Sequence, residues 1–127
     1  MTDAAADSAT LTPARDVRRF VRVYAADEVV FAHGARGTSM FVVVNGRVAV
    51  ERADGSRLAE LGPGEFFGEM ALVGEGVRAA TVRALDAATQ LAEIDRARFI
   101  YLVGQQPAFS LTVMRVLAER LGRAQAV

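Results

Sequence analysis

The stretch that decides the fold is VVVNGRVAV, which occupies residues 42–50. Two runs rich in valine flank the dipeptide Asn45-Gly46, and both members of that pair tolerate the positive φ angles of a two-residue turn. Strands favour β-branched side chains because these pack well on a pleated surface. The stretch therefore predicts a tight antiparallel hairpin between residues 42–44 and 48–50.

Further short, valine-rich runs lie on both sides of this hairpin at close spacing. Turn-forming residues separate them at 33–34, 54–55 and 62–64, and Asp54-Gly55 predicts a second hairpin. Many short strands with glycine turns indicate an antiparallel β-roll or jelly roll, the cupin-like double-stranded roll, which closes its own edges. The expected strands are residues 20–24, 28–32, 40–44, 47–52, 57–61, 79–84 and 89–94.

The last third of the chain changes to helical spacing. Asp95 is a suitable N-cap for a helix that Pro107 stops, and a second helix follows until Gly122 ends it. Its apolar residues Phe109, Val113 and Val116 recur at helical spacing, so we expect them to pack on the roll. The fold class is thus mainly β with C-terminal helices.

A chain of 127 residues is of ordinary size for one domain. Residues 1–10 are small, polar and aperiodic, which predicts a disordered tail. We therefore expect a single domain over 11–127, with the roll at about 20–94 and the terminal helices at about 95–122.

Composition excludes several kinds of function. Fifteen basic residues, all arginine, balance 15 acidic ones, so direct nucleic-acid binding is not expected. Cysteine is absent and His33 is the only histidine, which leaves almost no side chains for a metal site. His33 precedes Gly34, and we expect it to be a turn residue. No apolar run approaches the roughly 20 residues that cross a membrane, and no targeting signal is visible. We expect a cytoplasmic protein without membrane contact.

Five of the eleven glycines fall between residues 62 and 76. Glycine-rich segments are often only turns, but here the order of residue types is informative. Gly68 opens a short helical turn whose free backbone amides can approach an anion, and Arg78 follows as a bidentate phosphate clamp. Glu69 would repel a phosphate, yet it can accept a hydrogen bond from a sugar hydroxyl. The segment indicates a site for a sugar phosphate.

Residues 67–72, a five-residue loop and residues 78–82 together resemble the phosphate-binding cassette of the cyclic-nucleotide-binding domain family. The resemblance extends over roughly residues 20–121. It implies that Arg78 holds the cyclic phosphate and Glu69 the ribose 2′-hydroxyl. Backbone amides complete the phosphate cradle in this family. The ligand-binding residues implied are Gly68, Glu69, Met70, Ala71, Arg78, Ala79, Ala80 and Arg120.

Two of these residues bear on the base of the nucleotide. Relatives that prefer cGMP often carry threonine at the place of Ala79, so alanine favours cAMP, with cGMP as the other possible ligand. Arg120 is expected either to stack on adenine as a cation over an aromatic face or to be solvated beside Glu119. No other cofactor is expected.

The function implied is a stand-alone, non-enzymatic module that binds a cyclic nucleotide and moves its last helix toward an unidentified effector protein. We expect a monomer or a weak homodimer through that helix. Two alternatives stay open: a cyclic-nucleotide-binding fold that has lost its ligand and serves as a protein-interaction module, and a cupin-like enzyme. The single histidine and absent cysteine argue against the enzyme.

Overall fold

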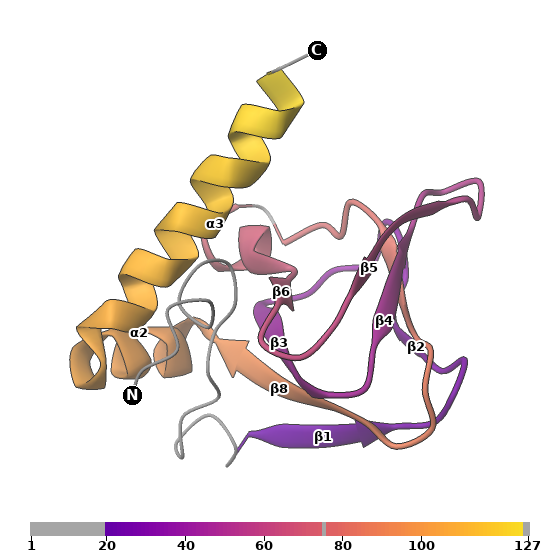
Figure 1. The fold of residues 1–127 in the computed structure, drawn as a ribbon, viewed down its shortest axis with the longest axis horizontal. Coiled ribbons are helices and arrows are strands. Elements are labelled where there is room, and N and C mark those ends of the chain that lie inside the picture. Colours follow the sequence, from indigo (N-terminus) through magenta and orange to yellow (C-terminus); the bar gives the residue numbers. More distant parts are fainter. Residues whose placement is uncertain (1–19, 75, 126–127) are drawn as a thin grey trace, which may run out of the picture.

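The computed structural model of the chain describes residues 20–74 and 76–125, with the expected tail at 1–10 outside that part. Two four-stranded antiparallel sheets form a β-roll, and two helices cover one side of it (Figure 1). The strands are β1 (Val21–Tyr24), β2 (Val29–Phe31), β3 (Ser39–Asn45), β4 (Val48–Glu51), β5 (Arg57–Leu61), β6 (Phe66–Phe67), β7 (Thr81–Ala84) and β8 (Thr89–Asp95). A short 3-10 helix, η2 (Glu69–Leu72), separates β6 from β7, and the helices are α2 (Arg96–Gln105) and α3 (Pro107–Gln125).

The strand order confirms the predicted roll. One sheet has the order β1-β8-β3-β6 and the other β2-β7-β4-β5, so most neighbours in space are distant in sequence. Strand β8 lies between β1 and β3, which ties the two ends of the roll together. The second predicted hairpin is confirmed, because β4 pairs with β5 across a turn in which Gly55 has a φ of 88°.

The first predicted hairpin is wrong. Residues 42–44 and 48–50 belong to different sheets, with β3 paired to β8 and β6, and β4 paired to β5 and β7. The turn itself is as expected, because Gly46 has a φ of 83°. The residues of the turn determine where the chain changes direction. The pairing of the flanking strands depends on β7 and β8, which come much later in the sequence. The Asn45-Gly46 turn is thus a corner between sheets.

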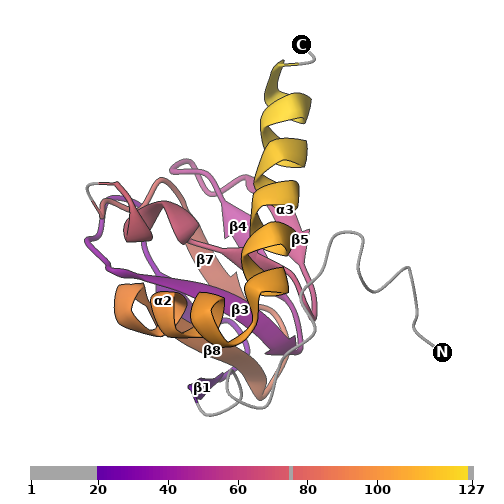
Figure 2. The ribbon, with the colours of Figure 1, turned by 90° about the vertical axis from the view of Figure 1, so that its left-hand side faces the viewer.

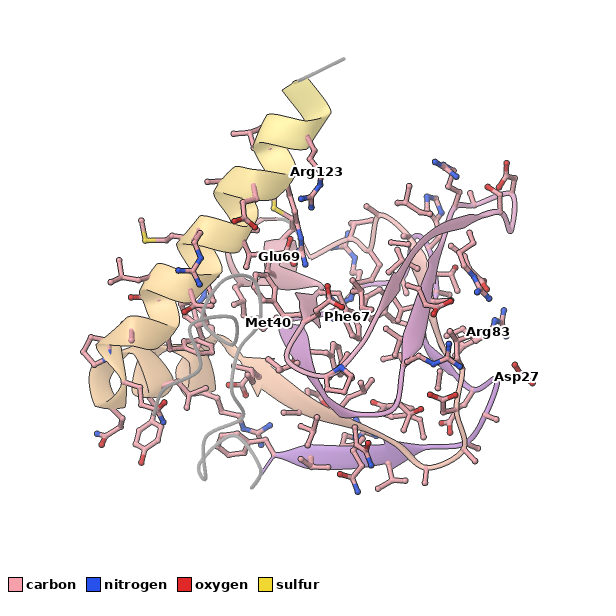
Figure 3. The ribbon with its side chains drawn as sticks, in the orientation of Figure 1. Asp27, Met40, Phe67, Glu69, Arg83 and Arg123 are labelled. Carbon is pink, nitrogen blue, oxygen red and sulfur yellow. The ribbon has the colours of Figure 1, made fainter. Side chains whose placement is uncertain are left out.

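Strand β3 is buried on both faces, and this explains its continuous apolar run. Met40 and Val42 face the helices, together with Phe66, Leu102 and Val113. The alternate residues of β3, Phe41 and Val43, face the interior of the roll with Phe67 of β6. Figure 3 labels Met40 on the helix side and Phe67 on the roll side. Strand β6, which the sequence did not reveal, thereby contributes one phenylalanine to each core.

The helices begin as predicted, but the second ends later. The Asp95 carboxylate accepts a 2.8 Å hydrogen bond from the backbone amide of Arg98 and so caps α2. Helix α3 continues through Gly122 to Gln125, and Gly122 keeps a negative φ. A glycine weakens a helix but ends it only when it adopts the left-handed conformation. The expected stop at Gly122 is therefore wrong.

Helix α3 packs on the roll through its first half, where Phe109, Val113 and Val116 are buried as expected. Its C-terminal half extends beyond the sheets, as both views show (Figure 1 and Figure 2). Within residues 20–74 and 76–125, no helix has the length and apolar character needed to span a membrane. Residues 79–80 lie in a bend before β7, so the strand predicted at 79–84 begins two residues late.

Candidate functional site

Seven of the eight predicted ligand-binding residues line one pocket on the roll. Side chains of β2, β4 and β7 form its apolar wall, and η2 with the bend before β7 forms its rim. The eighth residue, Arg120, lines a neighbouring hollow that it shares with Gly68 and Glu69. The sequence prediction therefore selected residues that the fold brings together, and the predicted residues in the pocket are Gly68, Glu69, Met70, Ala71, Arg78, Ala79 and Ala80.

Gly68 heads the turn at the rim of the pocket. It adopts a left-handed conformation with a φ of 77° and directly precedes η2, as the sequence predicted. The amides of Glu69 and Met70 have no hydrogen-bond partner in the described part of the chain. The amide of Ala71 is different, because it donates to the Gly68 carbonyl at 3.2 Å. The amides of this turn that are free to meet an anion are therefore those of Glu69 and Met70.

Arg78 is almost wholly buried, with 6% of its surface exposed. Its Nη1 donates to the Gly68 carbonyl at 3.2 Å, and its Cζ lies 4.1 Å from the ring centroid of Phe31. The buried Nε has no hydrogen-bond partner, and no carboxylate in residues 20–74 or 76–125 forms an ion pair with this guanidinium. Arg78 thus carries a buried charge with an unused donor.

Burial has an electrostatic cost that no ion pair offsets among residues 20–74 and 76–125. Loss of solvent lowers the pKa of Arg78, and the more distant carboxylate of Glu93 opposes this only in part. An arginine nevertheless remains protonated at physiological pH. A buried charge without a partner is unfavourable unless an ion of opposite sign is supplied. The site is therefore suited to an anionic ligand.

Two glycines leave room for the guanidinium. A Cβ atom on Gly37 would lie 2.4 Å from Nη2 and 2.5 Å from Nε of Arg78, and a Cβ on Gly68 would lie 2.9 Å from Nη1. Real Cβ atoms essentially never lie within 3.0 Å of such neighbours, so a side chain at either position would displace the guanidinium. Arg78 can occupy its buried position only because both neighbours lack a side chain.

Glu69 contacts α3 rather than solvent alone. Its Oε1 accepts a 3.3 Å hydrogen bond from Nη1 of Arg120, whose Nη2 donates to the Phe66 carbonyl at 2.6 Å. The Arg120 guanidinium also lies 4.6 Å from the centroid of the Phe66 ring. Figure 3 shows Glu69 directly beneath α3. The alternative in which Arg120 is merely solvated beside Glu119 is wrong, and its stacking on a purine stays a prediction.

The remaining site residues are on the surface. Met70 and Ala79 are exposed at the rim, and Ala80 is half-buried. Sequence reasoning missed Phe31 and Gly37, which contact the guanidinium from β2 and from the loop that follows it. A phenylalanine in a short strand and a glycine in a loop are too common to indicate such a role. Only the fold shows that they lie against Arg78.

A β-roll with a buried, unpaired arginine beside a glycine-headed turn defines a domain that binds small anionic ligands. Comparison with known proteins specifies it further: the sequence model described as "Cyclic nucleotide-binding domain" matches residues 21–106. The chain belongs to the cyclic nucleotide-binding domain family. Membership implies a cyclic nucleotide as ligand, and the buried Nε and charge of Arg78 fit the phosphate of such a molecule.

Individual relatives support the same assignment. The chain is 34% identical over 107 residues to the cyclic AMP receptor protein of Thermus thermophilus, covering 81% of this chain and 49% of that protein. The solved structure of the catabolite activator protein of the same organism has a TM-score of 0.76 and 32% identity, covering 87% of this chain and 54% of the other.

A further solved structure comes from work on a cyclic-GMP-dependent signalling pathway that regulates bacterial phytopathogenesis. It has a TM-score of 0.74 and 32% identity, and the match covers 89% of this chain and 97% of that one. Three curated relatives are much longer than this chain. The chain spans 49%, 24% and 16% of their lengths, so it corresponds to one domain of those proteins.

Proposed function

We propose that the protein is a regulatory module that binds cAMP in preference to cGMP and transmits binding through α3. The observation that carries the proposal is the state of Arg78, which is buried and charged and has neither an ion-pair partner nor a partner for Nε. A cyclic phosphate supplies one negative charge and oxygens that accept from a planar guanidinium. Ligand binding would thus remove an electrostatic cost that the free protein bears.

The other groups would hold the rest of the nucleotide. Glu69 and Met70 line the same pocket as Arg78, and their unpartnered amides would donate to phosphate oxygens. The bend at Ala79 and Ala80, of which Ala79 is exposed, would close the cradle from the other side. The Glu69 carboxylate would accept from the ribose 2′-hydroxyl, which a ribonucleotide has and its 2′-deoxy analogue lacks.

Transmission would start at Glu69, because this carboxylate belongs to the pocket and also binds α3. A ligand hydroxyl on Glu69 would change the environment of the 3.3 Å contact with Arg120, and the purine would lie near the hollow that Arg120 lines. A ligand can shift α3 only if the two positions of the helix bind it with different affinity. We propose that the Arg120 contacts provide that difference.

The output would go to another polypeptide rather than to catalysis. The side of α3 away from the roll exposes Leu111, Met114 and Leu121 at spacings of three and seven residues, which places them along one face of a helix. This exposed face would contact an effector protein or the same helix of a second chain in a weak homodimer. We propose a cytoplasmic location and no direct contact with nucleic acid or membrane.

The preference for cAMP would arise at Ala79, which has no hydroxyl to offer a guanine amino group. Titration calorimetry of the full chain with cAMP, cGMP and 5′-AMP, whose phosphate is not cyclic, tests the proposal. We expect one site per chain, tighter binding of cAMP than of cGMP, and much weaker binding of 5′-AMP. Absence of heat with both cyclic nucleotides would instead support a protein-interaction module that has lost its ligand.

A further inference from the structure

Three phenylalanines gather beneath the buried guanidinium, and none of them has a role in the function proposed above. The rings of Phe41 and Phe67 stack with centroids 5.4 Å apart, and the ring of Phe31 packs against both at 5.9 Å and 5.8 Å. Phe31 is the ring nearest to Arg78, with 4.1 Å between its centroid and Cζ. Phe41 is more distant at 5.8 Å.

Arg78 has few other contacts that fix its side chain. It makes one hydrogen bond, to the Gly68 carbonyl at 3.2 Å, and no ion pair within residues 20–74 and 76–125. Desolvation opposes its charge in this position, as the lowered pKa indicates. A solvated rotamer is the alternative, because a long arginine side chain can turn its head outward to water. Some favourable interaction must balance the desolvation.

We propose that Phe31 is a positioning residue, which holds the Arg78 guanidinium in its buried position before any ligand arrives. A cation over an aromatic face is attracted by the ring quadrupole, and the attraction grows when water is excluded, as it is here. The neighbouring rings of Phe41 and Phe67 keep the Phe31 ring in place. This inference rests on the proposed function for its effect on affinity, but not for its effect on Arg78 itself.

The fraction of molecules that hold Arg78 in the buried position affects the apparent affinity for the ligand. If only a fraction of the molecules hold Arg78 in the buried position, the apparent dissociation constant is the intrinsic constant divided by that fraction. Replacing Phe31 with an aliphatic residue removes the attraction and lowers the fraction. Another aromatic residue at this position retains the attraction.

Calorimetry on variants tests this effect. Phe31→Leu should weaken cAMP binding by about 3- to 30-fold, the range that cation–π energies give, whereas Phe31→Tyr should stay within about 2-fold of the parent. Phe99→Leu is the matched control, because Phe99 is also half-buried and paired with another ring, Phe109, but belongs to the helix-side core. The control should lose stability without losing affinity.

A double-mutant cycle between Phe31 and Arg78 separates a positioning role of Phe31 from a general effect on packing. In an Arg78→Ala background, Phe31→Leu should leave the residual cAMP affinity unchanged, because there is no guanidinium left to position. An equal loss of affinity in both backgrounds, or equal losses for Phe31→Leu and Phe99→Leu, would overturn the proposal.

A measurement without ligand keeps the two proposals distinguishable. In the NMR spectrum of the free parent protein, the Arg78 Nε proton should be shifted by the ring current of Phe31 and should exchange slowly with water. Random-coil shift and fast exchange in the parent would overturn the positioning role, whatever the protein binds. If the parent shows the shifted and protected proton and yet binds no cyclic nucleotide, that result would overturn only the proposed function.

Discussion

Arg120 and Glu69 are 51 positions apart in the sequence, yet Nη1 of the arginine donates to Oε1 of the glutamate at 3.3 Å. The contact joins α3 to η2, and a second bond from Arg120 reaches the backbone of β6 at the Phe66 carbonyl. Both bonds depend on one side chain of the terminal helix. The part of the protein that would sense the ribose is therefore in direct contact with the part that would signal.

Removing this contact should loosen the helix. Arg120→Ala loses a charged hydrogen bond to Glu69 and one to a carbonyl. Because the pair is partly exposed, we expect the free energy of unfolding to fall by about 1 to 3 kcal/mol. Amides after Val116 in α3 should also exchange faster with solvent. Arg115→Ala is the control, because Arg115 is exposed on the same helix and has no ion pair among the described residues. Identical exchange in the two variants would show that Arg120 does not anchor the helix.

Glu69 should distinguish a ribonucleotide from its deoxy analogue. The parent should bind 2′-deoxy-cAMP more weakly than cAMP by about 1.5 to 3 kcal/mol, the usual contribution of a hydrogen bond to a charged group. Glu69→Ala should bind the two ligands equally, because the acceptor is gone. Calorimetry with both ligands measures the difference, and undiminished affinity of the parent for the deoxy ligand would remove Glu69 from the ribose site.

Gly68→Ala should affect both stability and binding. At a φ of 77° a side chain costs about 1 to 2 kcal/mol, and its Cβ would also displace Nη1 of Arg78, which lies 2.9 Å from that position. Gly55→Ala carries the same backbone strain at a φ of 88° but has open space around it, and Gly55 does not line the pocket. Both variants should melt earlier, and only Gly68→Ala should lose affinity for cAMP. Equal affinity in the two would contradict the steric account.

Ala79→Thr tests the proposed preference for cAMP. The hydroxyl oxygen would accept one additional hydrogen bond from the guanine amino group, which should improve cGMP binding by about 2- to 10-fold relative to cAMP. Ala79→Val adds a similar volume without a hydroxyl, and it should leave the ratio of the two affinities unchanged. A cGMP preference in the parent itself would contradict the selectivity proposal while leaving the fold unaffected.

Local chemistry allowed much of the fold to be predicted. The Asp95 cap, the turn at Gly55 and the apolar face of α3 all depend on neighbours in sequence, and all three are confirmed. The pairings of residues 42–50 with β7 and β8 could not be predicted, because these partners lie 32 or more positions away in the sequence. Strand β6 was missed because two residues are too few to show any period.

The site was predictable to a similar extent. The spacing of Gly68, Glu69 and Arg78 indicated the pocket, and the fold does bring these residues together. The partners of those residues were not predictable. Phe31 and Arg120 reach the cassette from β2 and α3, and which side chain meets which is decided by how the helices and sheets pack.

Arg78 is the residue on which the account depends. Its substitution by alanine removes one hydrogen bond but also a buried charge that has no ion-pair partner. The free energy of unfolding of the ligand-free variant should therefore fall by no more than the contribution of one hydrogen bond. Arg78→Lys should rescue binding only in part, because a point charge cannot reproduce the planar, bidentate guanidinium. These two variants provide the material for the most direct test.

That test is the cAMP-dependent shift in melting temperature of the parent and of Arg78→Ala, with dissociation constants from calorimetry on the same samples. At a hundred times its dissociation constant, cAMP should stabilise the parent by about 2.7 kcal/mol. The variant should lose about 2 to 5 kcal/mol of binding free energy, roughly 30-fold to several thousand-fold in affinity. The same cAMP concentration should therefore stabilise it by less than about 0.9 kcal/mol, so its melting temperature should rise much less than that of the parent. A shift in Arg78→Ala equal to that of the parent would contradict the assignment of this arginine to the cyclic phosphate.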